Sequence, residues 1–304
     1  MRSLLFVPGD SPRKMEKAST SGADALILDL EDSVSPSRKA EAREHVAKFV
    51  AGAERTFPAP RLIVRVNALD TGLTDDDLTA VIGARPDAVL LPKAGSGADI
   101  QDLGARIAVV EAEAGLSDGC VLIHALMTET AAGLLQAGSF AGKSKRLSAL
   151  AWGAEDLAAD IGATSNKDES GHYTDVFTMA RSLTLLAAAQ SGVEAVDTVF
   201  TDFRDMQALK LECQAAVRDG FSGKMAIHPD QVPVINAAFT PAAEDVERAI
   251  KILALFAAAG PDAGVLSLEG KMIDKPHLRQ AERIARRAGL DPATLPAMED
   301  VDGE

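Results

Sequence analysis

The sequence predicts a (β/α)8 barrel followed by a C-terminal helical extension. Eight short apolar runs alternate with longer helical patterns, which is typical of repeated βα units and a parallel sheet. Polar residues follow these runs at the ends where the loops of a barrel mouth begin. The 304 residues, 47% of them hydrophobic, suffice for one large domain with an appendage. The same alternation is also compatible with an open, doubly wound sheet.

The predicted strands are the runs 3–8, 25–30, 62–67, 88–93, 120–127, 147–153, 195–202 and 223–229. Helices follow with recognisable starts, because Ser11 precedes Pro12 and Ser35 precedes Pro36, and proline is favoured at the first helical position. Between residues 202 and 220, one helical face carries Met206, Leu209, Cys213, Ala216 and Val217. Each predicted strand is thus followed by a segment that can return to the same sheet.

The chain continues after the eighth run, so we expect two parts, a barrel over 1–240 and an extension over 241–304. Thr240 and Pro241 predict the start of another helix, and Gly260 predicts its end. A loop with the apolar segment GVLSLEGKMID then leads to a last helix that ends at Gly289. Because the extension is too short for a substantial core, we expect it to pack on the barrel or on a neighbouring subunit.

Composition excludes several classes of partner. The net charge of −14 is spread along the chain, which argues against nucleic acid and anionic membrane as partners. The two cysteines form no CxxC pair, so neither a disulfide scaffold nor a structural zinc site is expected. No apolar run approaches the roughly 18 residues of a membrane span, and the N-terminal apolar stretch is too short for a signal peptide. We therefore expect a cytoplasmic protein.

Charged residues gather at the ends of the predicted strands. Their order along the chain is Asp29, Glu31 and Asp32, then Arg65, Lys93, Glu129, Glu155 and Asp156, Asp202, and finally His228. Because the carboxyl ends of barrel strands meet at one mouth, we expect these side chains to converge there. Separated carboxylates beside an arginine suit a divalent cation that holds an oxygen-rich ligand.

Purely structural roles also remain open for these residues. Asp29 and Glu31 can instead form structural ion pairs with Arg65 and Lys93, and the sequence favours this interpretation for Asp29. Glu129 and Asp156 are also typical first-turn helix acids, and His228 is also typical of a hydrogen-bonded loop histidine. Two glycine-rich segments, GSFAGKS (138–144) and GSGADI (95–100), lack the spacing of a phosphate loop and of a dinucleotide fingerprint, so we exclude an NTPase and a nicotinamide enzyme.

A series of motifs, in order from residue 2 to about residue 288, resembles the citrate lyase β-subunit-like family of CoA-ester lyases. The motifs are RSLLFVPGDSPRKMEKA, LILDLEDSVSPSRKAEAR, IVRVNALDTG, LLPKAG, TETAAG, WGAEDLAADIGAT, GKMAIHPDQVPVINAAFTP and GKMIDKPHLRQAERI. The resemblance implies a (β/α)8 barrel in homotrimers or multiples of them. It also implies Mg2+-dependent, or Mn2+-dependent, cleavage or formation of a C–C bond between an acyl-CoA and a 2-oxo acid such as pyruvate, glyoxylate or oxaloacetate.

The resemblance also implies roles for individual residues. Glu129 of TETAAG and Asp156 of WGAEDLAAD would be the Mg2+ ligands, and Glu155 is the nearest rival to Asp156. Such a site fits a hard cation that takes one or two carboxylates and keeps several waters. Arg65 of VRVN would face the thioester carbonyl, where negative charge grows as an enolate forms.

Supporting residues come from other strands. Glu31 and Asp32 would orient Arg65 and the metal-bound water, and Lys93 would contribute to substrate binding. The phosphates of CoA would be bound by Arg13, Lys14 and Lys17 in the first βα turn, of which Lys17 matches the family best. The alternative for these three cations is a solvated helix face.

The resemblance gives the extension a role through Asp274 of GKMID. This aspartate would reach the active site of an adjacent subunit and act as acid or base for the enolate carbon. We expect desolvation there to raise its pKa toward the working pH. If the extension only caps the barrel, Asp274 is a turn residue instead.

Several activities remain open at the level of sequence. A malyl-CoA thioesterase, a citrate lyase β subunit acting on an acyl-carrier-protein thioester, and a catalytically silent CoA-binding module are the alternatives to a CoA-ester lyase. The segment 165–182 is short, which resembles citramalyl-CoA or citrate-lyase-like members more than malyl-CoA lyases. The oxo acid itself is not specified, because a single methyl group separates pyruvate from glyoxylate.

Overall fold

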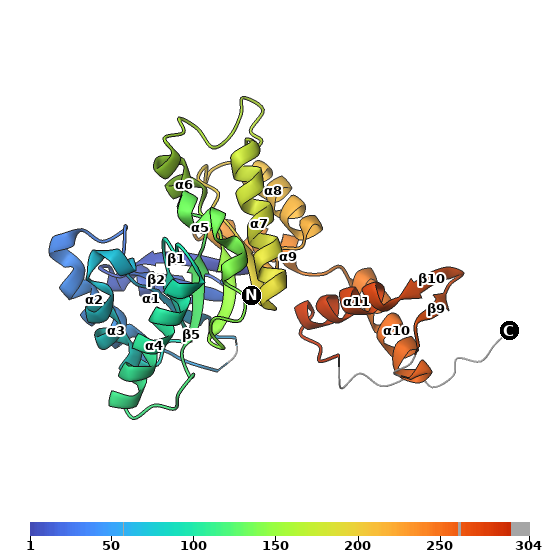
Figure 1. The fold of residues 1–304 in the computed structure, drawn as a ribbon, viewed down its shortest axis with the longest axis horizontal. Coiled ribbons are helices and arrows are strands. Elements are labelled where there is room, and N and C mark those ends of the chain that lie inside the picture. Colours follow the sequence, from blue (N-terminus) through green and yellow to red (C-terminus); the bar gives the residue numbers. More distant parts are fainter. Residues whose placement is uncertain (57, 261–262, 293–304) are drawn as a thin grey trace. The chain divides into compact units, whose positions relative to one another are not determined.

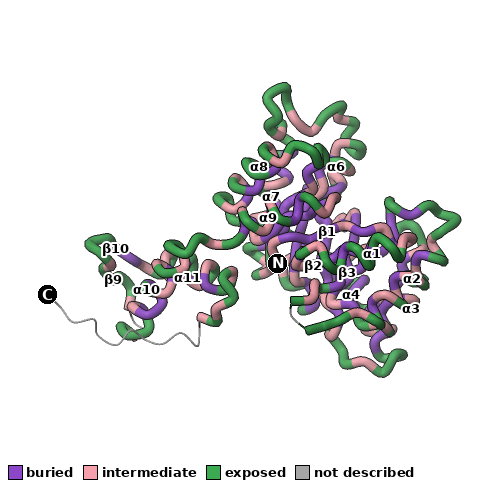
Figure 2. Tube along the Cα trace, turned by 180° about the vertical axis from the view of Figure 1, so that it is seen from behind, coloured by how far each residue is buried: buried purple, intermediate pink, exposed green. Residues whose placement is uncertain are grey.

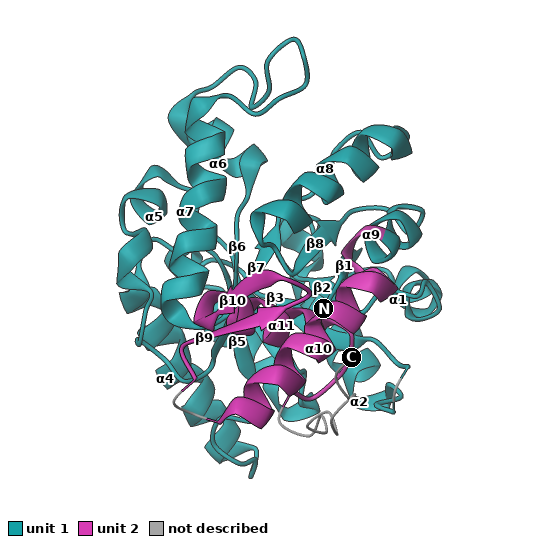
Figure 3. Ribbon diagram, turned by 90° about the vertical axis from the view of Figure 1, so that its right-hand side faces the viewer, with its two compact units in different colours: residues 1–237 teal, residues 238–304 magenta. Residues whose placement is uncertain are grey.

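A computed structural model describes residues 1–56, 58–260 and 263–292 of the chain. The chain divides into two compact units, Met1–Ala237 and Ala238–Glu304 (Figure 3). Each unit is described by itself below. Among the described residues, no helix is both long enough and apolar enough to cross a membrane.

The first unit contains a closed barrel of eight parallel strands (Figure 1). The strands are β1 Ser3–Pro8, β2 Ala25–Asp29, β3 Arg61–Arg65, β4 Ala88–Leu91, β5 Leu122–Leu126, β6 Leu147–Ala151, β7 Glu194–Asp197 and β8 Gly223–Ala226. They pair in chain order, and β8 closes on β1 through Leu4 and Met225. This confirms the predicted (β/α)8 barrel and excludes the open, doubly wound sheet.

Helices connect the strands, as the alternating pattern predicts. They are α1 Pro12–Ser19, α2 Lys39–Gly52, α3 Thr74–Val81, α4 Gly97–Glu113, α5 Ala131–Leu135, α6 Ala154–Ile161, α7 Asp175–Ser191, α8 Met206–Asp219 and α9 Gln231–Phe239, with short 3-10 turns at Pro36–Arg38, Leu69–Thr71, Ile82–Ala84 and Ala137–Ser139. Ser11 precedes α1 as expected but makes no side-chain capping hydrogen bond. Pro36 begins a 3-10 turn rather than the α-helix itself.

The barrel interior explains why its strands read as continuous apolar runs. Alternate residues of the strands form one buried cluster inside the barrel: Leu4, Ala25, Ile27, Ile63, Ala88, Leu90, Leu126, Ala149, Ala151, Val196 and Met225. The intervening residues point outward under the helices and are also buried, so the strands lie in the buried part of the unit (Figure 2). A strand buried on both faces needs apolar side chains at nearly every position.

The second unit consists of two helices and a hairpin. They are α10 Ala243–Ala259, β9 Val265–Leu268, β10 Lys271–Asp274 and α11 Lys275–Arg287, with β9 and β10 antiparallel. The expectation of a loop before the last helix was therefore wrong. The turn residues Glu269 and Gly270 both have positive φ, as a two-residue hairpin turn requires.

This unit has a small apolar cluster of its own, formed by Ala249, Ile252, Leu253, Phe256, Ile273, Ala281 and Ala285. The cluster packs one face of α10 against α11 and the hairpin. The helix predicted from Thr240 and Pro241 begins slightly later, since Ala242 is its N-cap residue. The boundary between the units lies at Ala237, three residues before the end of the predicted barrel segment.

Candidate active site

A cavity of about 450 Å³ lies at the carboxyl ends of the barrel strands. Its charged lining residues are Asp29, Asp32, Arg65, Glu129, Glu155 and Asp156. The apolar part of its lining includes Phe6, Leu126, Val199, Met225 and Ile227. The structure thus brings acids from β2, β5 and β6 together with the arginine of β3, as the order of polar strand ends predicts.

Arg65 is held by a two-point ion pair with Asp29. Its Nε lies 2.7 Å from Asp29 Oδ1 and its Nη2 lies 2.7 Å from Asp29 Oδ2. Burial alone would raise the pKa of Asp29, but the arginine lowers it below its ordinary value. The pKa of Arg65 is raised by the same contacts, against the effect of burial. Both groups therefore stay charged, and the guanidinium cannot turn freely.

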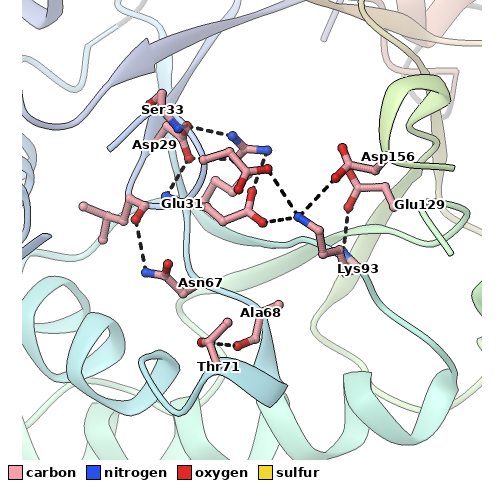
Figure 4. Close-up of polar contacts among 12 residues, drawn as sticks. Asp29, Glu31, Ser33, Asn67, Ala68, Thr71, Lys93, Glu129 and Asp156 are labelled. Atoms are coloured by element: carbon pink, nitrogen blue, oxygen red, sulfur yellow. Dashed lines mark hydrogen bonds and ion pairs between the residues drawn. The ribbon is translucent and has the colours of Figure 1, made fainter. Parts of the chain in front are cut away.

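Glu31 joins the two cations of this site. Its Oε2 lies 2.8 Å from Arg65 Nη1, as an ion pair rather than a directed hydrogen bond, and its Oε1 accepts a hydrogen bond from Lys93 Nζ (Figure 4). Burial raises the pKa of Glu31, while Arg65 and Lys93 oppose that shift. The structural ion pairs considered from the sequence are therefore present.

Lys93 lies at the centre of the acidic group. Its Nζ is 3.3 Å from Asp32 Oδ2 and 3.2 Å from Asp156 Oδ1 (Figure 4). Burial disfavours the charged form of Lys93, but Glu31 and Asp156 raise its pKa above the ordinary value. The ammonium group thus partly neutralises three carboxylates that the barrel mouth brings together.

The backbone of Lys93 is as informative as its side chain. Its φ of 52° lies in the left-handed region, which is rare for a residue with a Cβ. In this conformation Lys93 N donates a hydrogen bond of 2.7 Å to Glu129 Oε2. Strained backbone of this kind is concentrated at functional sites, because surrounding structure must hold it in place.

Glu129 is a buried carboxylate next to like charge. Burial raises its pKa to about 8, Asp156 adds to this shift, and the hydrogen bond from Lys93 N opposes it. The charge of Arg65 also opposes the rise, but burial and Asp156 outweigh it. The addition of a divalent cation would stabilise the charged form of both groups.

The donor set fits a magnesium ion rather than a transition metal. Among the described residues, no group of three or more His, Cys, Asp or Glu side chains could hold a metal ion together. Glu129 and Asp156 nevertheless line one cavity and supply oxygen only. Mg2+ binds through one or two carboxylates and fills its remaining positions with water and substrate oxygens.

The end of β6 is shaped around Glu129. A Cβ placed on Gly153 would lie 2.6 Å from Glu129 Cγ, so a side chain there would displace the carboxylate. Gly153 is the N-cap residue of α6 and provides no side-chain cap. Helix α6 therefore begins at the cavity without a side-chain cap, and its N-terminal end favours an anion.

Glu155 and Asp156 are adjacent but have different partners. Glu155 Oε1 accepts a hydrogen bond of 2.7 Å from Asn166 Nδ2, in the loop after α6. Asp156 instead faces Lys93 and adds to the charge around Glu129. These partners favour Asp156 over Glu155 as the second acid of a metal site.

At the ends of two strands, β7 and β8, the cavity is lined by residues other than the predicted ones. Strand β7 ends at Asp197, so Thr198 and Val199 line the cavity in place of Asp202. Strand β8 ends at Ala226, and Ile227 lines the cavity in place of His228. No pattern in the sequence singles out Thr198, because the apolar run continues past it to Phe200.

The predicted CoA-binding cations lie apart from the cavity lining. Arg13, Lys14 and Lys17 are exposed on α1, which follows β1. The cavity contacts Pro8, at the end of β1, but none of the three cations. The observed exposure is compatible with both a phosphate-binding surface and a solvated helix face.

Asp274 belongs to the second unit, where it is the N-cap residue of α11. Its Oδ1 lies 2.5 Å from His277 Nδ1. This contact lowers the pKa of Asp274, which is opposite to the rise expected for an acid at neutral pH. Within one chain Asp274 is therefore ionised, and a proton-donating role requires burial against another surface.

Comparisons with known proteins give matches along most of the chain. Residues 2–229 match the family model described as HpcH/HpaI aldolase/citrate lyase. The chain is 33% identical over 305 residues to the L-malyl-CoA/beta-methylmalyl-CoA lyase of Cereibacter sphaeroides, which covers 95% of both chains. It is 34% identical over 288 residues to a (3S)-malyl-CoA thioesterase of the same species, which covers 94% of both chains.

A solved structure is similar along nearly the whole chain. The crystal structure of the protein CitE from Mycobacterium tuberculosis, in complex with magnesium, acetoacetate and coenzyme A, superimposes with a TM-score of 0.72. The two chains are 34% identical, and the similarity covers 95% of this chain and 98% of the other.

Proposed function

The chain belongs to the HpcH/HpaI aldolase/citrate lyase family, and we propose that it is a Mg2+-dependent lyase acting on CoA esters. The reaction cleaves, or in reverse forms, the C–C bond between an acyl-CoA such as acetyl-CoA and a 2-oxo acid. The observation that carries the proposal is the buried Glu129, which lines one cavity with Asp156 and Arg65. This arrangement offers two anionic groups for a cation and one fixed cation for a developing negative charge.

Glu129 and Asp156 would hold the Mg2+ ion. When bound, the ion would polarise oxygen atoms of the oxo acid portion as a Lewis acid. The binding of magnesium by the similar CitE protein supports this assignment, and Mn2+ would suit the same oxygen donors. Gly153 leaves room for the Glu129 side chain, and Lys93 N fixes one of its oxygens.

Arg65 would stabilise the thioester oxygen as it gains negative charge. Asp29 fixes its guanidinium on two sides, so no reorientation is needed during the reaction. Preorganised donors in a water-poor site are worth most at such a position. Glu31 positions both Arg65 and Lys93, and Asp32 contributes acidic oxygen near the cavity mouth.

The carboxylate of the oxo acid would lie at the start of α6. The first N–H groups of this helix have no side-chain cap, and the helix dipole favours an anion there. The acids of the cavity would otherwise repel an anionic substrate. The start of α6 would thus bind the carboxylate of the oxo acid, and Arg65 would bind the thioester oxygen.

The phosphates of CoA would bind to Arg13, Lys14 and Lys17 on α1. These side chains are exposed and close in sequence to Pro8, which lines the cavity. A phosphate group would gain charge-assisted hydrogen bonds from them. The binding of coenzyme A by the similar CitE protein supports a CoA ester as substrate.

Asp274 would supply the proton that completes cleavage. A base takes the substrate's hydroxyl proton, and rupture of the C–C bond then gives the oxo acid and an enolate; for the next step Asp274 must carry a proton in the assembled site. Asp274 then returns one proton to the enolate carbon, which yields the acyl-CoA. Because Asp274 is partly exposed and ionised in the single chain, we propose that it acts in the site of an adjacent subunit, in a homotrimer or a multiple of it.

A coupled assay tests the proposal directly. The enzyme is mixed with Mg2+ and either malyl-CoA or citramalyl-CoA, and the released oxo acid is trapped with phenylhydrazine. We expect phenylhydrazone formation with at least one ester. No oxo acid from either ester, with a known lyase active under the same conditions, would contradict the lyase assignment.

A thioesterase is the second candidate, because a malyl-CoA thioesterase is as similar to this chain as a lyase is. Such an enzyme adds water to the thioester carbonyl and releases free CoA. A thiol reagent added to the same reaction separates the two activities. Free thiol without oxo acid indicates the thioesterase, and oxo acid without free thiol indicates the lyase.

A further inference from the structure

The side-chain hydroxyl of Thr198 is buried and has no hydrogen-bond partner among the described residues. The residue is 1% exposed. Buried hydroxyl groups are nearly always paired, because an unpaired one loses its hydrogen bonds to water without replacement. Where such a hydroxyl also lines a cavity, it is available to a bound molecule.

The position of Thr198 indicates where such a partner would lie. The side chains of the two preceding residues point to opposite sides of the barrel wall. Val196 packs inside the barrel, and Asp197 accepts hydrogen bonds from Trp152 and Lys224 on the outside. Thr198 itself lines the active-site cavity. Because the hydroxyl and the methyl group share one Cβ, rotation about χ1 is sufficient to present the hydroxyl to a bound molecule.

The surroundings restrict the chemistry of the partner. Thr198 follows β7, which pairs with β6, so it lies next to the strand that leads into α6. Val199, Met225 and Leu126 form the neighbouring apolar lining. A neutral donor on the strand next to an uncapped helix start suits an anionic oxygen.

We propose that Thr198 is a substrate-binding residue whose hydroxyl donates a hydrogen bond to a carboxylate oxygen of the bound 2-oxo acid. This inference rests on the proposed function, and it adds a residue of β7 to the acids of β5 and β6. The hydroxyl group complements the N–H groups of α6. The oxo acid therefore binds between the ends of β6 and β7, with its other substituent on the apolar lining.

The chain offers matched variants for a test. T198V keeps the shape of the side chain and removes the hydroxyl, whereas T198S keeps the hydroxyl. Thr128 provides a control, because it is also fully buried with an unpaired Oγ1 but does not line the cavity. Removal of an unpaired hydroxyl should leave each valine variant at least as stable as the wild type.

Binding can be followed without turnover through Trp152, which is the one tryptophan of the sequence. This residue precedes Gly153 of the cavity lining. Its fluorescence is recorded while pyruvate or glyoxylate is added to the full-length protein with Mg2+, and calorimetric titration provides the same constants independently. We expect T198V to bind the oxo acid about ten- to a hundredfold more weakly, with T198S and T128V close to wild type.

The outcomes separate this inference from the proposed function. If T198V binds the oxo acid as tightly as the wild type, and its melting temperature is equal to or higher than that of the wild type, the role of Thr198 is overturned. The proposed lyase function is not contradicted by that result. Equal losses in T198V and T128V also overturn it, because they indicate a general effect of core substitution. A wild-type protein that binds oxo acid but cleaves no CoA ester contradicts the lyase and retains the Thr198 site.

Discussion

Lys93 donates its backbone N–H to Glu129 Oε2 at 2.7 Å while its side chain lies 3.2 Å from Asp156 Oδ1. One residue in a left-handed backbone conformation thus touches both acids that we assign to Mg2+. The two acids belong to different strand ends, β5 and β6. Their approach therefore depends on barrel closure and on the unusual geometry at the end of β4.

The assignment of Asp156 rather than Glu155 is tested by a pair of conservative variants. D156N should lower turnover about 100-fold or more, because a lost metal ligand removes roughly 3 kcal/mol of transition-state stabilisation. E155Q should have a much smaller effect, since Glu155 bonds Asn166 instead of facing Lys93. Initial rates over a Mg2+ titration provide the measurement. The reverse ranking of the two variants would transfer the ligand role to Glu155.

Metal-free protein should lose stability as pH rises. The pKa of Glu129 is about 8 in the folded chain and about 4.3 when unfolded, so the folded state binds this proton more tightly. Binding of this proton stabilises the folded state fully below about pH 4, and the stabilisation is lost as the pH rises through 8. The total loss is a few kcal/mol at most. The unfolding free energy of the wild type should therefore fall relative to that of E129Q as the pH rises from 6 to 9.

Added Mg2+ should reverse this loss in the wild type alone. A cation that binds the ionised carboxylate stabilises the folded state more at pH 8.5 than at pH 6.5, where a proton competes with it. Urea titrations with and without Mg2+ at the two pH values measure the effect. Equal Mg2+ stabilisation of wild type and E129Q would be inconsistent with Glu129 as a ligand.

The structural role of Arg65 should be separable from its catalytic role by two variants. R65M leaves the buried Asp29 without its partner, which should cost about 3–5 kcal/mol of stability. The double variant R65M/D29N removes both charges and should recover much of that loss. Turnover should remain about 100- to 1,000-fold low in both variants, because the cation near the thioester is absent. Recovery of activity together with stability would assign Arg65 a structural role only.

The sequence predicted the barrel well because buried parallel strands leave a direct signal. Runs such as SLLFVP and ALILD are apolar on both faces, and helices with clear starts separate them. The hairpin of the second unit was missed, since Glu269–Gly270 lacks the Asn-Gly or Asp-Gly signature of a tight turn. A glutamate with positive φ, such as Glu269, gives no signal of a tight turn in the sequence.

The acids and Arg65 were predictable, whereas Thr198 and the Lys93 backbone were not. Charged residues directly after apolar runs have few structural explanations, so the sequence indicates them. Thr198 lies inside the run AVDTVF, and only the pairing of β7 with β8 shows that the strand has already ended at Asp197. The φ of Lys93 likewise depends on tertiary contacts rather than on its residue type.

The proposed action of Asp274 in an adjacent subunit predicts complementation. D156N lacks the proposed metal ligand of the first unit, and D274N lacks the proposed proton donor of the second unit. Each should be inactive alone. Subunits of the two variants, mixed and allowed to exchange, should regain activity, because some mixed sites contain both wild-type residues. Mixed oligomers, verified by mass spectrometry, that stay inactive would instead place both residues in one chain's site.

Gly153 provides the most specific test of the geometry around Glu129. A Cβ at this position would lie 2.6 Å from Glu129 Cγ and 2.8 Å from its Oε1, so G153A must displace the carboxylate. Gly153 has a φ of −122°, which alanine adopts without backbone strain. The expected result is therefore weaker Mg2+ binding with little change in folding of the barrel.

A matched control is G95A, where the nearest atom to the new Cβ would be Asp99 Oδ2 at 3.4 Å. Gly95 lies in the neighbouring loop after β4 and does not line the cavity. Calorimetric Mg2+ titration of both variants should show an affinity loss of about tenfold or more in G153A alone, as expected when a ligating carboxylate is moved. Since both substitutions add one methyl group, a general effect of bulk would appear in both. Wild-type Mg2+ affinity in G153A would mean that the ion does not bind Glu129 in the position that the structure gives this side chain.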